Sequence, residues 1–294
     1  MRTVGGQSDV GTLRRVAVKH ARDAFGGDTT IDRQWHDLHY LARPDFAAAV
    51  AEYERFLALL EAAGVETLCL PPDQSVGLDS LYARDVSIVC DRGVILCNMG
   101  KPQRRTEPAA QEAAFAAAGI PILGRITGDG RVEGGDVCWI DERTLAVGRG
   151  YRTNDAGIEQ LRELVTDCVD EVLVVPLPHW RGPEDVFHLM SIVSPIDRDL
   201  LLVYAPLVPV PFHEALRARR LELVEVPGSE FDTLGCNVLA IGPREVVMVA
   251  GNPGTRARLE RAGATVHEFA GREICVKGGG GPTCLTRPLL RDRV

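Results

Sequence analysis

The chain has 294 residues, of which 45% are hydrophobic and 25% are charged, a balance that is typical of a soluble globular protein with a sizeable core. The formal net charge is -8 and the 33 lysines and arginines are scattered, so the composition argues against a nucleic-acid-binding protein and fits a small cationic substrate better. There is no signal-peptide pattern and no apolar run of about 18 residues, so we expect a cytoplasmic protein that does not contact a membrane.

Five segments have the spacing of apolar residues that is typical of an amphipathic helix, and several begin at Thr, Asp or Pro and end at Gly. Each is followed by a short apolar stretch rich in β-branched residues, which predicts a strand, and then by a loop and a second strand-like run. This unit repeats without an evident linker, so we expect one α/β domain over residues 1–294, with its repeated core at about 12–290. The expected helices lie at 44–64, 106–119, 153–168, 211–220 and 254–263, and the strands after them at 65–70, 120–126, 171–177, 221–227 and 264–269.

One polar side chain stands beside the second strand-like run of each unit. Successive members of this set are roughly 50 residues apart, which is close to the length of the unit. If five units form a ring with strands inside and helices outside, equivalent positions converge on the axis although they are distant in the sequence. The set consists of Asp85, Glu133, His188, Asn237 and Cys284.

Cys284 differs from the other cysteines of the chain. The eight cysteines include no CxxC pair and no zinc-site spacing, and most lie in apolar runs where Cys is a small buried hydrophobe. Cys284 instead follows the glycine run 278–281 and precedes Thr-Arg-Pro. Such a glycine run indicates that the backbone bends sharply or closely approaches another group. The alternatives for Cys284 are a functional thiol, which we expect, and a packed structural one.

A cysteine, a histidine and two carboxylates can together support covalent catalysis. A thiolate is a competent nucleophile, and a nearby imidazole can hold it ionised, protonate a leaving group and then activate water. The carboxylates can hold a planar cation with several donors, such as a guanidinium, by paired hydrogen bonds. These residue types therefore favour a cationic guanidino substrate.

Five short motifs occur in a fixed order along the chain. They are ARD at 83–85, EGGD at 133–136, HL at 188–189, GCN at 235–237 and GGGPTCLTRPL at 279–289. Together they resemble the guanidino-group modifying (pentein) superfamily, which contains dimethylarginine dimethylaminohydrolases, arginine deiminases and amidinotransferases. The resemblance runs along nearly the whole chain from about residue 12. It implies a five-bladed α/β propeller of ββαβ-type units with pseudo-fivefold symmetry and an active site on the axis, without a metal or an organic cofactor.

The resemblance also implies a role for each catalytic residue. Cys284 would be the nucleophile, His188 the general acid and then the general base, and Glu133 the carboxylate that orients the histidine. Asp85 and Asp79 would bind the guanidinium nitrogens. The implied reaction passes through an S-alkylthiouronium intermediate, which water hydrolyses to a ureido product such as citrulline.

Arginines can bind the carboxylate of an amino-acid substrate. Arg104 or Arg105, together with Arg152, stand at positions that resemble the carboxylate-binding arginines of the dimethylargininases. The alternative is that they are solvated surface charges. Asp136 stays open between substrate binding and turn contacts to the backbone, whereas Asn237 is expected to be structural.

The exact substrate and reaction type stay open. Met190 stands where arginine deiminases and amidinotransferases typically have an Asp, and an apolar side chain there leaves room for alkyl groups on the guanidinium nitrogen. We therefore expect a hydrolase that acts on arginine or an N-methylated arginine. An amidinotransferase and a non-catalytic propeller that binds a ligand are the alternatives. His36 and His39 lie in a long N-terminal connection that is a candidate lid, and a homodimer is among the possible oligomeric states.

Overall fold

The structure is a computed structural model that describes residues 4–185 and 187–293. The strands in these ranges are β1 (Leu13–Val18), β2 (Glu66–Cys69), β3 (Ser87–Cys90), β4 (Gly93–Leu96), β5 (Ile122–Arg125), β6 (Val137–Asp141), β7 (Thr144–Arg149), β8 (Glu171–Pro176), β9 (Val193–Asp197), β10 (Leu200–Val203), β11 (Glu222–Glu225), β12 (Leu239–Gly242), β13 (Glu245–Val249), β14 (Thr265–Phe269) and β15 (Thr286–Arg291). The α-helices there are α1 (Ala21–Phe25), α2 (Asp28–Gln34), α3 (Phe46–Ala62), α4 (Glu107–Ala117), α5 (Asp155–Val165), α6 (Val210–Ala218) and α7 (Pro253–Arg261). None of these helices has the length and apolarity that crossing a membrane requires.

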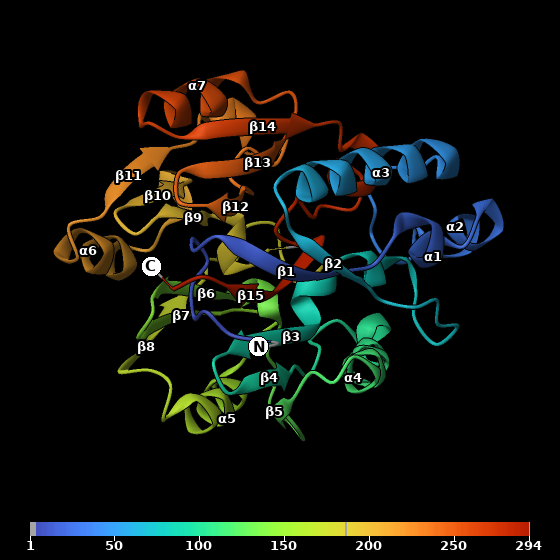
Figure 1. Cartoon of the computed structure of the whole chain (residues 1–294), viewed down its shortest axis with the longest axis horizontal. Coiled ribbons are helices and arrows are strands. Elements are labelled where there is room, and N and C mark those ends of the chain that lie inside the picture. The colour runs from blue at the N-terminus through green and yellow to red at the C-terminus, as the bar shows by residue number, and fades with distance from the viewer. Residues whose placement is uncertain (1–3, 186, 294) are drawn as a thin grey trace.

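The described strands form five three-stranded sheets of the same construction (Figure 1). In each sheet the middle strand pairs antiparallel with one neighbour and parallel with the other. A parallel pair needs a crossover connection, which a helix supplies in every sheet. The sheets are β15-β1-β2, β3-β4-β5, β6-β7-β8, β9-β10-β11 and β12-β13-β14, and their crossover helices are α3, α4, α5, α6 and α7.

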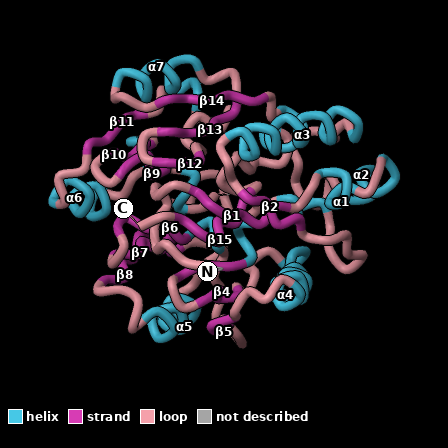
Figure 2. The backbone as a smooth tube through the Cα atoms, viewed as in Figure 1, coloured by secondary structure: helices cyan, strands magenta, loops and turns pink. Residues whose placement is uncertain are grey.

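The five crossover helices lie at the periphery of the view, around the strands (Figure 2). They and the strands that follow them coincide with the predicted helices and strands, so the predicted repeat of secondary structure is confirmed. Local capping agrees with the sequence signals. The side chain of Asp45 accepts a hydrogen bond from the Ala48 backbone N–H at 2.8 Å at the start of α3, and Asn154 accepts one from the Gly157 N–H at 2.9 Å at the start of α5.

The N-terminal connection between β1 and α3 contains two short helices that the sequence did not predict, α1 and α2, whereas residues 35–45, which include His36 and His39, contain no helix or strand. These helices have five and seven residues, too few for the apolar periodicity by which a helix is recognised. Their ends are set by local contacts instead. The side chain of His20 caps α1, and Gly26 ends it in the left-handed conformation at φ 64°.

Apolar cores between neighbouring sheets hold the sheets in place. For example, Leu161 and Val165 of α5 are buried together with Val147 of β7 and Ile95 of β4. Because this core joins residues of two sheets, it fixes one sheet against the next. The positions of the sheets, and of the residues at their strand ends, are therefore coupled through the core.

The five polar residues picked out by their spacing lie at equivalent places in the five sheets. Each precedes, by a few residues, the strand that forms the antiparallel edge of its sheet. Their order is Asp85 before β3, Glu133 before β6, His188 before β9, Asn237 before β12 and Cys284 before β15. The sheet β15-β1-β2 contains the first and the last of the described strands, because β15 pairs antiparallel with β1.

Candidate active site

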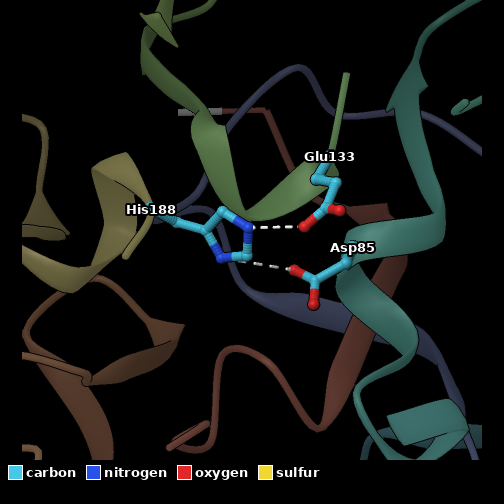
Figure 3. Close-up of side chains that lie close together, drawn as sticks. All are labelled: Asp85, Glu133 and His188. Atoms are coloured by element: carbon cyan, nitrogen blue, oxygen red, sulfur yellow. Dashed lines mark hydrogen bonds and ion pairs between the residues drawn. The ribbon is translucent and has the colours of Figure 1, made fainter. Parts of the chain in front are cut away.

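Three buried side chains from three different sheets meet at the centre of the candidate site (Figure 3). His188 Nε2 lies 2.8 Å from Glu133 Oε2, and His188 Nδ1 lies 3.8 Å from Asp85 Oδ1. Gly135 explains part of the EGGD motif, because a Cβ at this position would lie only 2.5 Å from His188 Nδ1 and 2.7 Å from Asp85 Oδ1. The predicted orientation of His188 by Glu133 therefore agrees with the observed hydrogen bond.

The charges of the site favour a protonated histidine. Burial alone would lower the pKa of His188, but the carboxylates of Asp85, Asp136 and Glu133 outweigh it and raise the pKa to about 9. Burial would likewise raise the pKa of Glu133, but the hydrogen bond from His188 and the charge of Arg152 hold it well below its usual range. At neutral pH His188 is thus an imidazolium with a proton to donate.

The thiol of Cys284 is buried and hydrogen-bonded to Asn237. Asn237 Nδ2 lies 3.4 Å from Cys284 Sγ, and Asn237 Oδ1 accepts hydrogen bonds from the backbone N–H and the hydroxyl of Thr283 at 3.1 and 2.8 Å. Burial, together with the charge of Asp85, raises the pKa of Cys284 to about 11, although the contacts of Thr283 and Asn237 oppose this shift. The thiol is therefore protonated at neutral pH unless a cation binds beside it.

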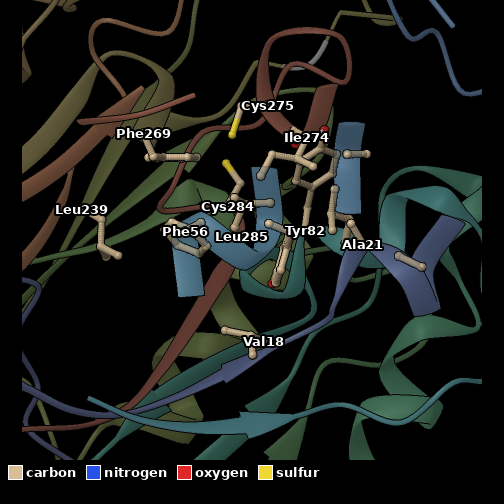
Figure 4. Close-up of a cluster of buried hydrophobic side chains, with 14 of the residues drawn as sticks. Val18, Ala21, Phe56, Tyr82, Leu239, Phe269, Ile274, Cys275, Cys284 and Leu285 are labelled. Atoms are coloured by element: carbon tan, nitrogen blue, oxygen red, sulfur yellow. Dashed lines mark hydrogen bonds between the residues drawn. The ribbon is translucent and has the colours of Figure 1, made fainter. Parts of the chain in front are cut away.

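The sequence predicted a structural role for Asn237 but not its contact with the thiol. The signal that could have found it was its place in the set of five equivalent residues. Figure 4 shows Cys284 in a buried cluster that also contains Tyr82 and Cys275. Cys275 is buried as well, but it does not line the cavities that Cys284 lines.

The glycine run lets the chain approach these side chains closely, as predicted. A Cβ at Gly281 would collide with Oδ1 of Asn237, and a Cβ at Gly278 would collide with the hydroxyl of Tyr82. Gly279 has φ +79°, in the left-handed region that favours glycine. The glycines therefore bring the segment before Cys284 into contact with Tyr82 and Asn237.

Four of the predicted substrate-binding residues lie together beside the predicted catalytic ones. Asp79, Asp85, Arg104 and Arg152 are buried and line one small cavity with His188, Cys284 and Lys101. The predicted alternative Arg105 is exposed and does not line this cavity.

The buried cations of this cavity are paired with its carboxylates. Arg104 Nη1 lies 2.5 Å from Asp85 Oδ2, and its guanidinium also donates to Glu107 at 2.8 Å. Arg152 Nη1 makes a longer contact of 3.3 Å with Glu133 Oε2.

Lys101 and Glu107 were not recognised from the sequence. Lys101 Nζ lies 2.6 Å from Asp79 Oδ2, and the backbone N–H of Lys101 donates to Glu133 Oε1 at 2.9 Å. Glu107 accepts hydrogen bonds from both Nε and Nη2 of the Arg104 guanidinium. Neither residue lies in the repeated set or in a motif, so their roles depend on contacts that only the folded chain makes.

Asp136 makes contacts within the protein. Its Oδ2 accepts a hydrogen bond from the hydroxyl of Thr153 at 2.7 Å, and its Oδ1 accepts one from the backbone N–H of Leu189 at 3.0 Å. Burial raises its pKa to about 6. These contacts hold the segment after His188 in place and favour the structural alternative for Asp136.

One carboxylate oxygen at the site accepts no hydrogen bond from the described residues, although His188 Nδ1 lies 3.8 Å from it. This oxygen is Oδ1 of Asp85, and it is buried. An unused buried acceptor is costly, so it indicates a donor that binds there. The ligand atoms of Asp85, Glu133 and His188 also lie within 4.8 Å of one another, a spacing that could hold a metal ion. Metal binding would require His188 to lose the proton that its raised pKa retains.

A wider pocket of about 130 Å³ leads to Cys284 and His188. Met190 lies in its wall, as do Trp180 and His39. His39 thus belongs to the pocket, whereas His36 is exposed and does not line it.

The α/β fold of small sheets and the buried Cys-His-Glu site define a guanidino-group modifying protein of the pentein superfamily. Residues 79–211 and 207–291 match the family described as arginine deiminase. The dimethylarginine dimethylaminohydrolase of Streptomyces coelicolor is 30% identical over 247 residues, which cover 82% of this chain and 86% of that one. The chain therefore belongs to the arginine deiminase family, and the predicted resemblance is confirmed.

Two solved structures have a similar fold. The dimethylarginine dimethylaminohydrolase of Pseudomonas aeruginosa, in complex with citrulline, has a TM-score of 0.75 at 24% identity and covers 96% of this chain and 100% of its own. An amidinotransferase of saxitoxin biosynthesis from Microseira wollei has a TM-score of 0.81 at 16% identity, with coverage of 99% and 98%. The shared fold thus spans a hydrolase and a transferase.

Proposed function

We propose that this protein hydrolyses the guanidinium group of arginine or of an N-methylated arginine through a covalent intermediate on Cys284. The observation that carries the proposal is the buried Oδ1 of Asp85, which accepts no hydrogen bond from the described residues and lies in a cavity that Cys284 and His188 also line. A guanidinium bound there supplies both the missing N–H donor and a positive charge. It also places an electrophilic carbon within the cavity of a nucleophilic sulfur.

In this proposal the five sheets are the blades of a propeller with pseudo-fivefold symmetry, and the site lies on its axis. The equivalent placement of Asp85, Glu133, His188, Asn237 and Cys284 before the antiparallel edge strands supports this arrangement. A ring of units brings such strand ends together and excludes water from them. The single domain of residues 1–294 is part of the same proposal.

The reaction begins when the guanidinium binds to Asp85, with Asp79 as a second carboxylate. Its positive charge lowers the pKa of the Cys284 thiol, which loses its proton to solvent. The thiolate attacks the guanidinium carbon. As the C–N bond breaks, His188 donates its proton to the departing amine and leaves an S-alkylthiouronium.

The second half of the reaction uses the neutral imidazole. His188 takes a proton from water, and the resulting hydroxide attacks the same carbon. The C–S bond then breaks to release the Cys284 thiolate, while the new hydroxyl loses its proton to solvent and becomes the ureido carbonyl. The product is a ureido compound, citrulline when the substrate is arginine or a methylated arginine. The hydrogen bond from Glu133 keeps the imidazole oriented in both steps.

The pocket supports assignments for the two ends of the substrate. Met190 lines the pocket and favours alkyl groups on the nitrogen, so we propose dimethylamine as a leaving amine beside ammonia. Arg152 is the better candidate for the substrate carboxylate, because its contact with Glu133 is longer than those of Arg104 with Asp85 and Glu107. Arg105 is the weaker alternative because it is exposed.

The test is an assay of ureido product with arginine and asymmetric dimethylarginine in parallel, with ammonia and dimethylamine measured separately. We expect turnover that Cys284→Ser abolishes, and a covalent adduct of His188→Gln that mass spectrometry locates on Cys284. Cys275→Ser is the matched control and keeps activity, because Cys275 lies outside both cavities that Cys284 lines. Transfer of the amidino group to added glycine would support an amidinotransferase instead. Binding of both substrates without any reaction would support a binding module.

A further inference from the structure

A second cavity contains a cluster of buried arginines. It has a volume of about 20 Å³ and is lined by Arg84, Arg287, Arg291 and Asp9. Residues of β3, β6 and β15 complete its wall, so it lies further along the same edge strands whose beginnings follow the active-site residues. The cluster is distinct from that site, although the backbone N–H of Arg84 donates to the carbonyl of Cys284 at 3.2 Å.

The only carboxylate among these four side chains is already used. Asp9 Oδ1 accepts from Arg84 Nη2 at 2.9 Å, and Asp9 Oδ2 accepts from the backbone N–H of Trp139 at 2.8 Å. Arg291 donates to two backbone carbonyls, those of Gly11 at 2.6 Å and Ala240 at 2.8 Å. Neutral carbonyls satisfy its hydrogen bonds but do not neutralise its charge.

Arg287 has the fewest hydrogen bonds of the three arginines among the described residues. Arg287 is buried, with only 5% of its surface exposed. Its Nε and Nη2 have no hydrogen-bond partner among the described residues. The Nε atoms of Arg84 and Arg291 also lack partners there. Burial and then the charge of Arg84 lower the pKa of Arg287 to about 9, although the charges of Asp9 and Asp85 oppose this shift. Three guanidinium groups and a single carboxylate, Asp9, thus line the same cavity.

We propose that this cavity binds one small inorganic anion of the halide class, with Arg287 as its main ligand. An anion would accept the free N–H groups of Arg287 and offset the excess positive charge. A water molecule could accept the same hydrogen bonds but would leave the charge unneutralised. A volume of about 20 Å³ is suited to one particle of roughly the size of water.

The bound anion would stabilise the closure of the chain. Asp9 belongs to the N-terminal segment, whereas Arg287 and Arg291 belong to β15, so the anion lies where the two ends of the chain meet. A ligand that binds only the folded state raises the unfolding temperature by mass action.

The first test is thermal unfolding of the full chain at constant ionic strength, with sodium gluconate replaced stepwise by sodium chloride or bromide. We expect a saturable rise of the midpoint by about 2–4 °C. Equal midpoints in gluconate and in both halides would overturn the proposal. Stabilisation by phosphate or sulfate without an effect of chloride would overturn the halide class.

Two substitutions test whether the halide effect on the unfolding midpoint comes from Arg287. Arg287→Met should abolish the response to halide, whereas Arg198→Met, at an exposed arginine, should keep it. A halide response that persists in Arg287→Met would contradict the assignment. If that variant does not fold, anomalous diffraction from wild-type crystals soaked in bromide is the alternative test. An anomalous peak at Arg287 would support the site, and its absence would reject it.

Discussion

Asn237 and Cys284 come from different sheets, and their contact links the reactivity of the thiol to a single amide. Asn237 is held by Thr283 on one side and donates to the sulfur on the other. A hydrogen bond to a charged group contributes about 1.5–3 kcal/mol, so its loss should raise the pKa of the thiol. Asn237 is therefore a positioning residue.

We predict that Asn237→Ala slows alkylation of Cys284 by iodoacetamide at pH 8 by about tenfold. Mass spectrometry of the Cys284 peptide measures this rate. Asn154→Ala is the control, because Asn154 caps α5 and should affect only stability. Equal alkylation rates in the wild type and Asn237→Ala would show that the amide does not tune the thiol.

The raised pKa of His188 predicts how stability depends on pH. The folded protein keeps the proton up to pH about 9, whereas the unfolded chain releases it near the ordinary value of 6.5. The stabilising contribution of His188 is thus complete below pH about 6.5 and is lost as the pH rises through about 9. Urea denaturation between pH 6 and 10 should show that the difference in stability between the wild type and His188→Gln shrinks over this window. A constant difference would contradict the raised pKa.

The raised pKa of His188 also predicts how the activity changes at alkaline pH. In the proposed mechanism the first step needs His188 as an acid, so kcat/KM should fall above pH about 9. A profile that keeps rising well beyond this pH would mean that another group protonates the leaving amine.

At the scale of elements, the glycine run determines where Cys284 lies. Gly281→Ala would force Asn237 away from its contacts, because the new Cβ would overlap Oδ1 of Asn237. We predict at least a tenfold loss of turnover together with slower alkylation of Cys284. The control is Gly228→Ala, since the atom nearest to a Cβ there is the Tyr204 hydroxyl, 4.0 Å away. Normal turnover of Gly281→Ala would show that the loop has space to adjust.

The elements that the sequence predicted are those with a long local pattern. The crossover helices α3 to α7 have nine to seventeen residues, enough for an apolar face to appear in the sequence. The short α1 and α2 were missed because two turns or fewer do not produce such a pattern. Their stability comes from packing, as in the buried Phe25 and Ile31, and not from intrinsic helix propensity.

At the scale of the whole molecule, closure between β15 and β1 holds the repeat together. The two strands pair antiparallel from Leu13↔Arg291 to Val18↔Thr286. Deletion of residues 286–294 would remove an entire edge strand and expose the core that Leu289 helps to form. We predict loss of cooperative thermal unfolding, measured by circular dichroism. Deletion of residue 294 alone is the control, and a cooperative transition in the longer deletion would show that closure is dispensable.

The amino-acid sequence by itself determined the repeat of helices and strands, the family, and the set of Asp85, Glu133, His188 and Cys284. These follow from local periodicity and from motif spacing, which can be recognised in the sequence without knowledge of any contact. The glycine run likewise predicted a close approach of the backbone, although not the groups that it approaches.

Only the tertiary structure decided which charges pair and which do not. The sequence could not reveal that Lys101 binds Asp79, that Arg104 lies between Asp85 and Glu107, or that Asn237 donates to Cys284. Nor could it show that Nε and Nη2 of the buried Arg287 donate no hydrogen bond to any described residue. The physical reason is that side chains from separate sheets come within hydrogen-bond distance only when the sheets pack together, and burial then sets both the strength of each contact and the cost of each missing one.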